Sequence, residues 1–317
     1  MNIFFLFLDG VGLGQDDPLS NPFIPAKTPF LDLLLDGRSL VNNLMPFTGE
    51  NATLLSLDAC LGVSGAPQSA TGQATLLTGV NIPERIGYHY GPKPNPEVSA
   101  YLKNGNIFSK LLNIGKRCAF LNAYPPAYFK HIQSGRRLYA AIPLAAVSAG
   151  LTLLTAQDLY DGNAVSADFT GQGWRAHLGF EDTPLYTPGE AGVRLGQLAQ
   201  KNDFSLFEYW LSDYAGHQQD MKTAIGLIET LDQVIEGLCN SWNPSSGLIV
   251  ITSDHGNLED LSTRKHTHNP VPAILIGSAY LRKKFQENLT DIAGITPAFY
   301  KLLSSEQNPE SSEEMPR

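Results

Sequence analysis

Residues 247–257 are GLIVITSDHGN, an apolar run that ends in a carboxylate and an imidazole side by side. A short, β-branched apolar run of this kind predicts a strand buried on both faces of a parallel sheet. Asp254 and His255 are unusual at the end of such a strand, because neither is a comfortable core residue. They suit a metal site, an acid/base pair or an ordinary turn, and the choice depends on what other segments bring to the same place.

Other segments alternate between strand-like and helix-like patterns. Strands are expected at 2–8, 52–59, 117–124, 204–211 and 272–277, and helices at 28–37, 69–79, 106–116, 187–200, 220–242 and 290–303. This alternation predicts an α/β fold: a doubly wound, mostly parallel sheet with helices on both faces.

The pattern weakens in the middle of the chain, where Gly, Pro and aromatic residues are scattered. We therefore expect residues 91–190 to form an inserted cap that bears on substrate. The remaining ranges, 1–90 and 191–305, would form a discontinuous catalytic core. Residues 306–317 are polar and acidic, which predicts a flexible tail.

Composition narrows the classes of partner. Of the 317 residues, 43% are hydrophobic and 17% charged, an ordinary globular composition, and the net charge of −9 gives no reason to expect nucleic acid or an anionic membrane. The apolar start MNIFFLFLDG meets Asp9 too early for a signal peptide or membrane span, so it predicts the first strand. Cys60, Cys118 and Cys239 are an odd number without a C-x-x-C pair, which favours a reducing cytoplasm.

Polar residues follow the predicted strands. In a sheet of this type, ligands gather outside the carboxyl ends of the strands, so these residues become neighbours in space. Asp213 and His217 are four residues apart, and one helical turn would point both side chains the same way. The residues concerned are Asp9, Asp213, His217, Asp254 and His255, with His266 and His268 just before the next strand.

Each of these motifs has a simpler explanation when taken alone. Asp9-Gly10 suits a turn, Asp213 with His217 suits a helix cap and a surface histidine, and SDHGN suits a loop. Together, at successive strand ends, they indicate metal binding. Carboxylates and imidazoles suit Mn or Zn, and this many ligands exceed one closed tetrahedral site. Two divalent ions sharing a cleft is an arrangement used to split phosphate esters.

The segment PQSATGQATLLTG, residues 67–79, offers a nucleophile. Ser69 would lie at or near a helix amino terminus, where free N–H groups stabilise an anion and a nearby metal lowers the pKa of the hydroxyl. Ser69 also suits a simple N-cap. The other hydroxyls of the segment, Thr71, Thr75 and Thr78, remain alternatives.

The order LDG, SATGQATLLTG, SDYAGH, TSDHGN and HTHNPVP resembles the alkaline phosphatase superfamily, in particular cofactor-independent phosphoglycerate mutase and phosphopentomutase. NPFIPAKTPFLDLL resembles the mutase segment after the first aspartate, and TLLTG resembles the nucleotide pyrophosphatases of the same superfamily. The resemblance covers about residues 1–90 and 190–303. One position departs from the mutases: Gln73 stands where they have histidine.

The resemblance implies the role of each residue. Ser69 matches the phosphorylated nucleophile, and its oxygen would be displaced by water or by a second substrate hydroxyl. One metal would be held by Asp9, Ser69, Asp254 and His255, and the other by Asp213, His217 and His266. His268 would face substrate.

Three functions fit these residues. We expect hydrolysis of a small-molecule phosphomonoester first, a phosphomutase second, and a non-catalytic metal-binding relative third. A mutase needs a closing cap and cations for a second phosphate. A sulfatase is not expected, because SATGQ lacks the Pro and Arg that follow the sulfatase nucleophile. The candidate substrate-binding residues are Arg85, His89, Arg136, Arg137, Arg175 and His268, with Lys93 and Lys130 as further cations. Solvated surface residues or a structural loop are the alternative interpretations of these positions.

Overall fold

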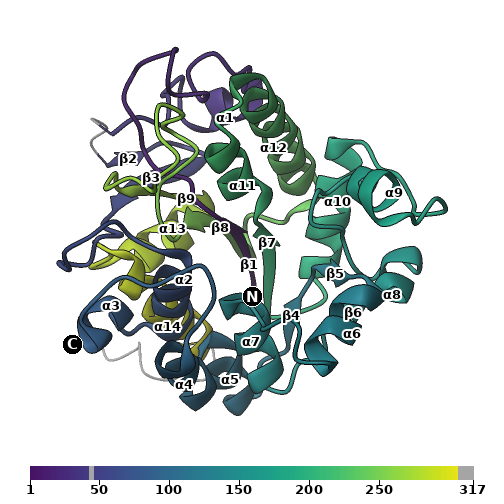
Figure 1. The fold of residues 1–317 in the computed structure, drawn as a ribbon. Coiled ribbons are helices and arrows are strands. Elements are labelled where there is room, and N and C mark those ends of the chain that lie inside the picture. The colour runs from purple at the N-terminus through teal and green to yellow at the C-terminus, as the bar shows by residue number, and fades with distance from the viewer. Residues whose placement is uncertain (43–45, 306–317) are drawn as a thin grey trace, which may run out of the picture.

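The computed structural model describes residues 1–42 and 46–305, and its centre is a seven-stranded sheet (Figure 1). The strand order is β2 (Phe47–Thr48), β3 (Ala52–Leu57), β9 (Val271–Gly277), β8 (Gly247–Ser253), β1 (Asn2–Leu8), β7 (Phe204–Tyr209) and β4 (Cys118–Phe120). The pairs β8–β1, β1–β7 and β7–β4 are parallel, whereas β9 is antiparallel to both β8 and β3. The predicted doubly wound α/β fold is confirmed, with a sheet that is mixed.

Helices cover both faces of the sheet, because successive strand side chains point to opposite sides. Phe5 and Phe7 of β1 pack on one face, and Phe4 and Leu6 pack on the other. The first face, here called the α2 face, carries α2 (Ser69–Thr78), α4 (Pro96–Asn104), α5 (Ile107–Asn113), α7 (Ala141–Ser148), α13 (Ala279–Gln286) and α14 (Ile295–Ser304). The second, the α12 face, carries α1 (Pro29–Leu34), α10 (Pro188–Ala199), α11 (Leu211–Gln218) and α12 (Met221–Ser241).

Most predicted elements are found with shifts at their ends. The helix predicted at 28–37 stops at Leu34, and the chain turns through Asp36 and Gly37, which both have positive φ. The helix predicted at 69–79 ends at Thr78, and Gly79 closes it in the left-handed conformation. The sequence patterns missed α13. The predicted tail, 306–317, lies outside the described residues.

The range expected to form a cap is divided in the structure. Its first part belongs to the main body, since β4 is an edge strand of the central sheet and α4 and α5 pack in the same hydrophobic cluster as β1. A smaller cluster of Ala123, Leu159, Ala164 and Trp174 lies further along the chain. The elements of that later part are β5 (Ala123–Tyr124), α6 (Pro126–Gln133), β6 (Leu154–Thr155), α8 (Ala156–Tyr160) and α9 (Gln172–Leu178).

Two short helices complete the described fold: α3 (Ile82–Ile86), which follows α2, and η1 (Ile292–Gly294), which precedes α14. No helix within 1–42 and 46–305 is long and apolar enough to span a membrane. The three cysteines, Cys60, Cys118 and Cys239, are free thiols.

Candidate metal centre

The candidate ligands lie at one edge of the sheet because of strand direction. The parallel strands β1, β7 and β8 end at this edge and are followed by Asp9, by α11 and by Asp254. β9 runs the opposite way, so it begins at the edge where β8 ends. The loop from 254 to 270 therefore stays at this edge, and it carries both His255 and His266.

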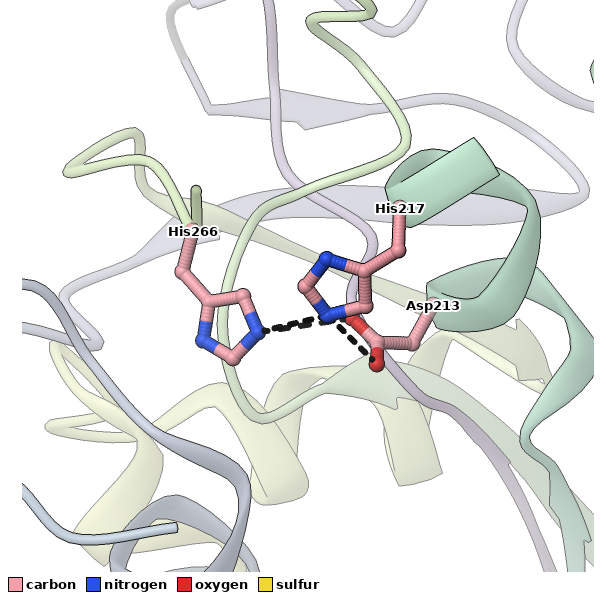
Figure 2. A group of neighbouring side chains, drawn as sticks. All are labelled: Asp213, His217 and His266. Carbon is pink, nitrogen blue, oxygen red and sulfur yellow. Dashed lines mark hydrogen bonds and ion pairs between the residues drawn. The ribbon is translucent and has the colours of Figure 1, made fainter. Parts of the chain in front are cut away.

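One group of candidate ligands is formed by Asp213, His217 and His266 (Figure 2). Asp213 and His217 lie one turn apart on α11, and His266 faces them from the loop before β9. His217 Nε2 lies 3.3 Å from Asp213 Oδ2, and His266 Nε2 lies 3.6 Å from Asp213 Oδ1. The predicted helical turn thus brings both α11 side chains to the same point, and His266 completes a three-residue set.

A second group surrounds His255. Its Nε2 lies 3.4 Å from Asp9 Oδ1, 3.5 Å from Asp254 Oδ2 and 3.0 Å from Ser69 Oγ. The ring of His255 stacks on that of His266 with centroids 3.7 Å apart, which joins the two groups. Asp213 is close to both groups, since it also clusters with Asp9 and His255.

The histidines are oriented as metal ligands are. The Nδ1 atom of His217 lies 2.8 Å from the Arg264 carbonyl oxygen, and the Nδ1 atom of His266 lies 2.8 Å from the Pro67 carbonyl oxygen. A proton on Nδ1 satisfies each carbonyl and leaves the Nε2 lone pair free, the tautomer that metal-binding histidines adopt. The two Nε2 atoms are 3.3 Å apart, and a cation between them would relieve the repulsion of their lone pairs.

Buried carboxylate oxygens also indicate a site for a cation. Asp9 Oδ1 and Asp254 Oδ2 are buried and accept no hydrogen bond within 1–42 and 46–305, and both lie near the same His255 Nε2, at 3.4 and 3.5 Å. One imidazole cannot neutralise two buried carboxylates, so a further cation would lower the cost of burying them. The donor set of carboxylates and imidazoles therefore fits divalent ions such as Mn or Zn.

The pKa values show how much negative charge the centre holds. Burial raises the pKa of Asp9 and raises that of Asp254 well above its ordinary range. Burial would lower the pKa of His255, but the carboxylates of Asp254 and Asp9 outweigh it and raise the value to about 10. Burial, with the positive charge of His255 beside it, lowers the pKa of His266 to about 4. The raised pKa values of Asp9 and Asp254 thus reflect burial and the crowding of acidic groups, which a bound cation would relieve.

Ser69 is the hydroxyl of α2 that faces this centre. It is the first residue of the helix, and the position before it is Gln68, so Ser69 is not the N-cap. The threonines of α2 are turned away: the hydroxyls of Thr71, Thr75 and Thr78 donate to the carbonyls of Gln68, Thr71 and Ala74 at 3.1, 2.8 and 2.7 Å. Geometry therefore separates the four hydroxyls that the sequence left open.

Three polar residues support the ligands and were not assigned roles from the sequence. Gln73 Nε2 donates to Asp9 Oδ2 at 3.2 Å, and Asn257 Nδ2 donates to Asp213 Oδ1 at 2.7 Å. Glu259 is buried beneath the loops. A signal existed for two of them, since Asn257 and Glu259 follow His255 directly in SDHGNLED, a polar run continuous with a buried strand.

The candidate substrate residues are more dispersed. Arg85, Arg136, Arg137, Arg175 and His268 are exposed, and His89 is half-buried with Nε2 3.2 Å from the Cys60 carbonyl oxygen. Arg175 is engaged locally, because Nε and Nη2 donate to the Thr183 carbonyl at 2.8 and 2.6 Å. The Arg137 guanidinium lies 4.9 Å from the centre of the Tyr128 ring. Across the described residues, no hydrogen bond or ion pair joins these six side chains to the metal-binding groups.

The family match lies in the carboxyl-terminal part of the chain, and the similar curated proteins match about a third of it. Residues 193–307 match the family model of the Metalloenzyme superfamily. The 2,3-bisphosphoglycerate-independent phosphoglycerate mutase of Antithamnion sp. is 34% identical over 114 residues, which cover 33% of this chain and 22% of the mutase. The same enzyme of Nitrosococcus oceani is 30% identical over 122 residues, which cover 36% of this chain and 23% of the mutase. The matches thus span less than a quarter of the length of these relatives.

Solved structures match the whole fold. The PH0037 protein from Pyrococcus horikoshii gives a TM-score of 0.57 at 15% identity, covering 100% of this chain and 98% of that one. The alkaline phosphatase of the Antarctic bacterium TAB5 gives a TM-score of 0.56 at 13% identity, covering 96% of this chain and 97% of that one. The chain therefore shares the fold of these structures, and its residues 193–307 match the Metalloenzyme superfamily.

Proposed function

We propose that the protein is a two-metal phosphoryl-transfer enzyme that hydrolyses a small-molecule phosphomonoester through a phosphoserine at Ser69. The observation that carries this proposal is the position of the Ser69 hydroxyl, which lies at the start of α2 and 3.0 Å from His255 Nε2. Similarity to phosphoglycerate mutases supports phosphoryl transfer as the reaction class.

The ligand residues divide into two sets in this proposal. Asp9, Ser69, Asp254 and His255 hold one Mn or Zn ion, and Asp213, His217 and His266 hold the other. The Nδ1 contacts of His217 and His266 support this division, as do the buried oxygens of Asp9 and Asp254 that accept no hydrogen bond. When bound, the ions lower the pKa of the Ser69 hydroxyl and offset charge on the phosphoryl oxygens.

The residues of α2 carry the chemistry of the proposal. The deprotonated Ser69 oxygen forms a bond to phosphorus, the ester P–O bond breaks, and the departing alkoxide takes a proton from water. The hydroxide left by that water then forms the next bond to phosphorus, the bond to Ser69 breaks with its oxygen again anionic, and hydrogen phosphate leaves. The N–H groups of Ser69 and Ala70 have no acceptor inside the helix, so they favour the phosphoryl anion throughout, whereas that of Thr71 donates to the Tyr90 carbonyl at 3.0 Å.

A phosphomutase is the second candidate, and the match to phosphoglycerate mutases favours it. In that reaction a second hydroxyl of the substrate, rather than water, accepts the phosphoryl group from Ser69. We propose that the cap is formed by the elements after β4 and before α10 other than α7, which packs on the main sheet, and that Arg136 and Arg137 supply cations for a second anionic group. A non-catalytic relative is the third candidate, and an intact ligand set with Ser69 beside it argues against it. We also propose a cytoplasmic location, in keeping with three free thiols.

The test measures phosphate release from a panel of phosphomonoesters and sugar phosphates. Metal-stripped protein is reloaded with Mn or Zn, and Ser69→Ala is compared with Thr78→Val, which removes an α2 hydroxyl bound to its own helix. We expect metal-dependent release that Ser69→Ala abolishes and Thr78→Val retains. An isomerised sugar phosphate without release would favour the mutase. Turnover that persists in Ser69→Ala would refute the phosphoserine.

A further inference from the structure

A buried carboxylate lies behind the metal centre and contacts two of its loops, the one after β1 and the one from 254 to 270. Glu259 is 1% exposed. Its Oε2 accepts hydrogen bonds from the N–H of Gly12 at 2.9 Å and of Asn257 at 2.7 Å. Its Oε1 accepts from the hydroxyl of Thr267 and from Nδ2 of Asn269, the latter at 3.1 Å. These four donors are all uncharged groups, so the carboxylate is satisfied by hydrogen bonds from neighbouring loops.

Each donor lies close in sequence to a candidate ligand. Gly12 is three residues after Asp9, and Thr267 directly follows His266. Asn257 is two residues after His255, and its side chain donates on to Asp213 at 2.7 Å. One carboxylate therefore joins the loops that carry ligands of both metal groups.

The surrounding glycines show how tightly the loops approach Glu259. A Cβ atom at Gly12 would come within 2.3 Å of Glu259 Oε1, and one at Gly256 within 2.2 Å. Real Cβ atoms do not approach oxygen this closely, so a side chain at either position would push the carboxylate or the loop away. The two glycines and Glu259 therefore fit together as one unit.

We infer that Glu259 is a positioning residue that sets the ligand geometry of both metal groups without touching either ion. The inference rests on the ligand set of the proposed function, but not on phosphoryl transfer. Removing the carboxylate frees four donors on these two loops, so the ligands on both loops lose their common anchor. Loss of such supporting hydrogen bonds lowers metal affinity by about 10- to 100-fold.

The experiment titrates the full, metal-stripped chain with Zn or Mn by isothermal calorimetry. We expect Glu259→Ala to weaken binding of both ions by about 10- to 100-fold. Glu259→Gln should recover most of the affinity, because its carbonyl oxygen can accept both backbone N–H groups while the Thr267 hydroxyl and Asn269 amide turn to accept from its NH2. Thr267→Val removes one donor and should weaken metal binding at the His266 group more than at the His255 group. This comparison still tests the inference if Glu259→Ala does not fold.

Asp232→Ala is the matched control. Asp232 is also a 1%-exposed carboxylate and accepts from the N–H groups of Phe30 and Leu31 at 3.2 and 2.8 Å, but it joins α12 to α1. The Asp232→Ala variant should have a lower melting temperature than wild type and the same affinity for both metal ions. Wild-type affinity in Glu259→Ala, or an equal loss in Asp232→Ala, would overturn the positioning role. Wild-type protein that binds no metal would overturn the ligand set as well, whereas tight binding without phosphate release would overturn the phosphatase alone.

Discussion

Glu208 gives a prediction whose size follows from its surroundings. It lies on β7 at the same face as Phe204 and Leu206, and it is 6% exposed. Burial raises the pKa of its carboxyl to about 8, with a further increase from the negative charge of Asp9 and a decrease from Arg137. At neutral pH the folded protein therefore holds a proton on Glu208, whereas the unfolded chain, with an ordinary pKa of 4.5, does not.

This difference makes stability depend on pH in a defined direction. The contribution of protonated Glu208 is fully present below pH 4.5 and is lost as the pH rises through 8, because the folded state binds the additional proton. Between these limits the free energy of unfolding should fall by about 1.4 kcal/mol per pH unit from this group alone. Across the window the loss is on the order of 5 kcal/mol.

Glu208→Gln keeps the shape of the side chain and removes the titration. Both proteins are unfolded in urea with chelator present, at about pH 5.5, 6.5 and 7.5. As the pH rises, the free energy of unfolding should shift in favour of the Glu208→Gln variant by about 1.4 kcal/mol per unit. Glu190→Gln is the control, since Glu190 caps α10 at the surface and its pKa is lowered by the Thr187 backbone and hydroxyl. A difference between Glu208→Gln and wild type that does not change with pH would refute the reasoning.

Three further outcomes concern the metal centre. Gly72→Ala adds a Cβ 2.8 Å from the Asp254 carbonyl oxygen, so α2 must shift, and phosphate release should fall about 100-fold. The control is Gly226→Ala on α12, whose Cβ meets nothing within 4 Å, and it should stabilise the protein by about 1 kcal/mol. Equal activity in the two variants would contradict this prediction. Reloading stripped protein with metal at 100 times its dissociation constant should raise the melting temperature by roughly 5–10 °C, and Asp213→Asn should remove most of that rise in calorimetric scans. Gln73→Leu removes the donor to Asp9 and should weaken metal binding by about tenfold or more. Gln73→His, which introduces the residue expected in the mutases, should keep the metal affinity within about tenfold of wild type. The reverse order of affinities would show that this hydrogen bond does not support Asp9.

Local patterns in the sequence were sufficient for the fold class and for the candidate ligands. Continuous apolar runs such as GLIVIT predict strands buried on both faces, and the polar residues that follow them predict where a site lies, because parallel strands end at one edge. The four-residue spacing of Asp213 and His217 predicts their shared direction on α11, and the structure places both beside His266.

Other features were decided only by the tertiary structure. Periodicity carries no information on strand direction, so it could not show that β9 is antiparallel to β8 and thereby keeps His266 at the ligand edge. It also could not place β4 in the main sheet rather than in the cap.

The choice among Ser69, Thr71, Thr75 and Thr78, and the burial of Glu259, depend on which groups the folded chain brings within hydrogen-bonding distance. Gly12, Asn257 and Thr267 are separated from one another by up to 255 residues, and they reach one carboxylate because β1 and β8 end, and β9 begins, at the same edge of the sheet. Local sequence determines the elements and their faces, whereas contacts between distant segments exist only once the sheet has assembled.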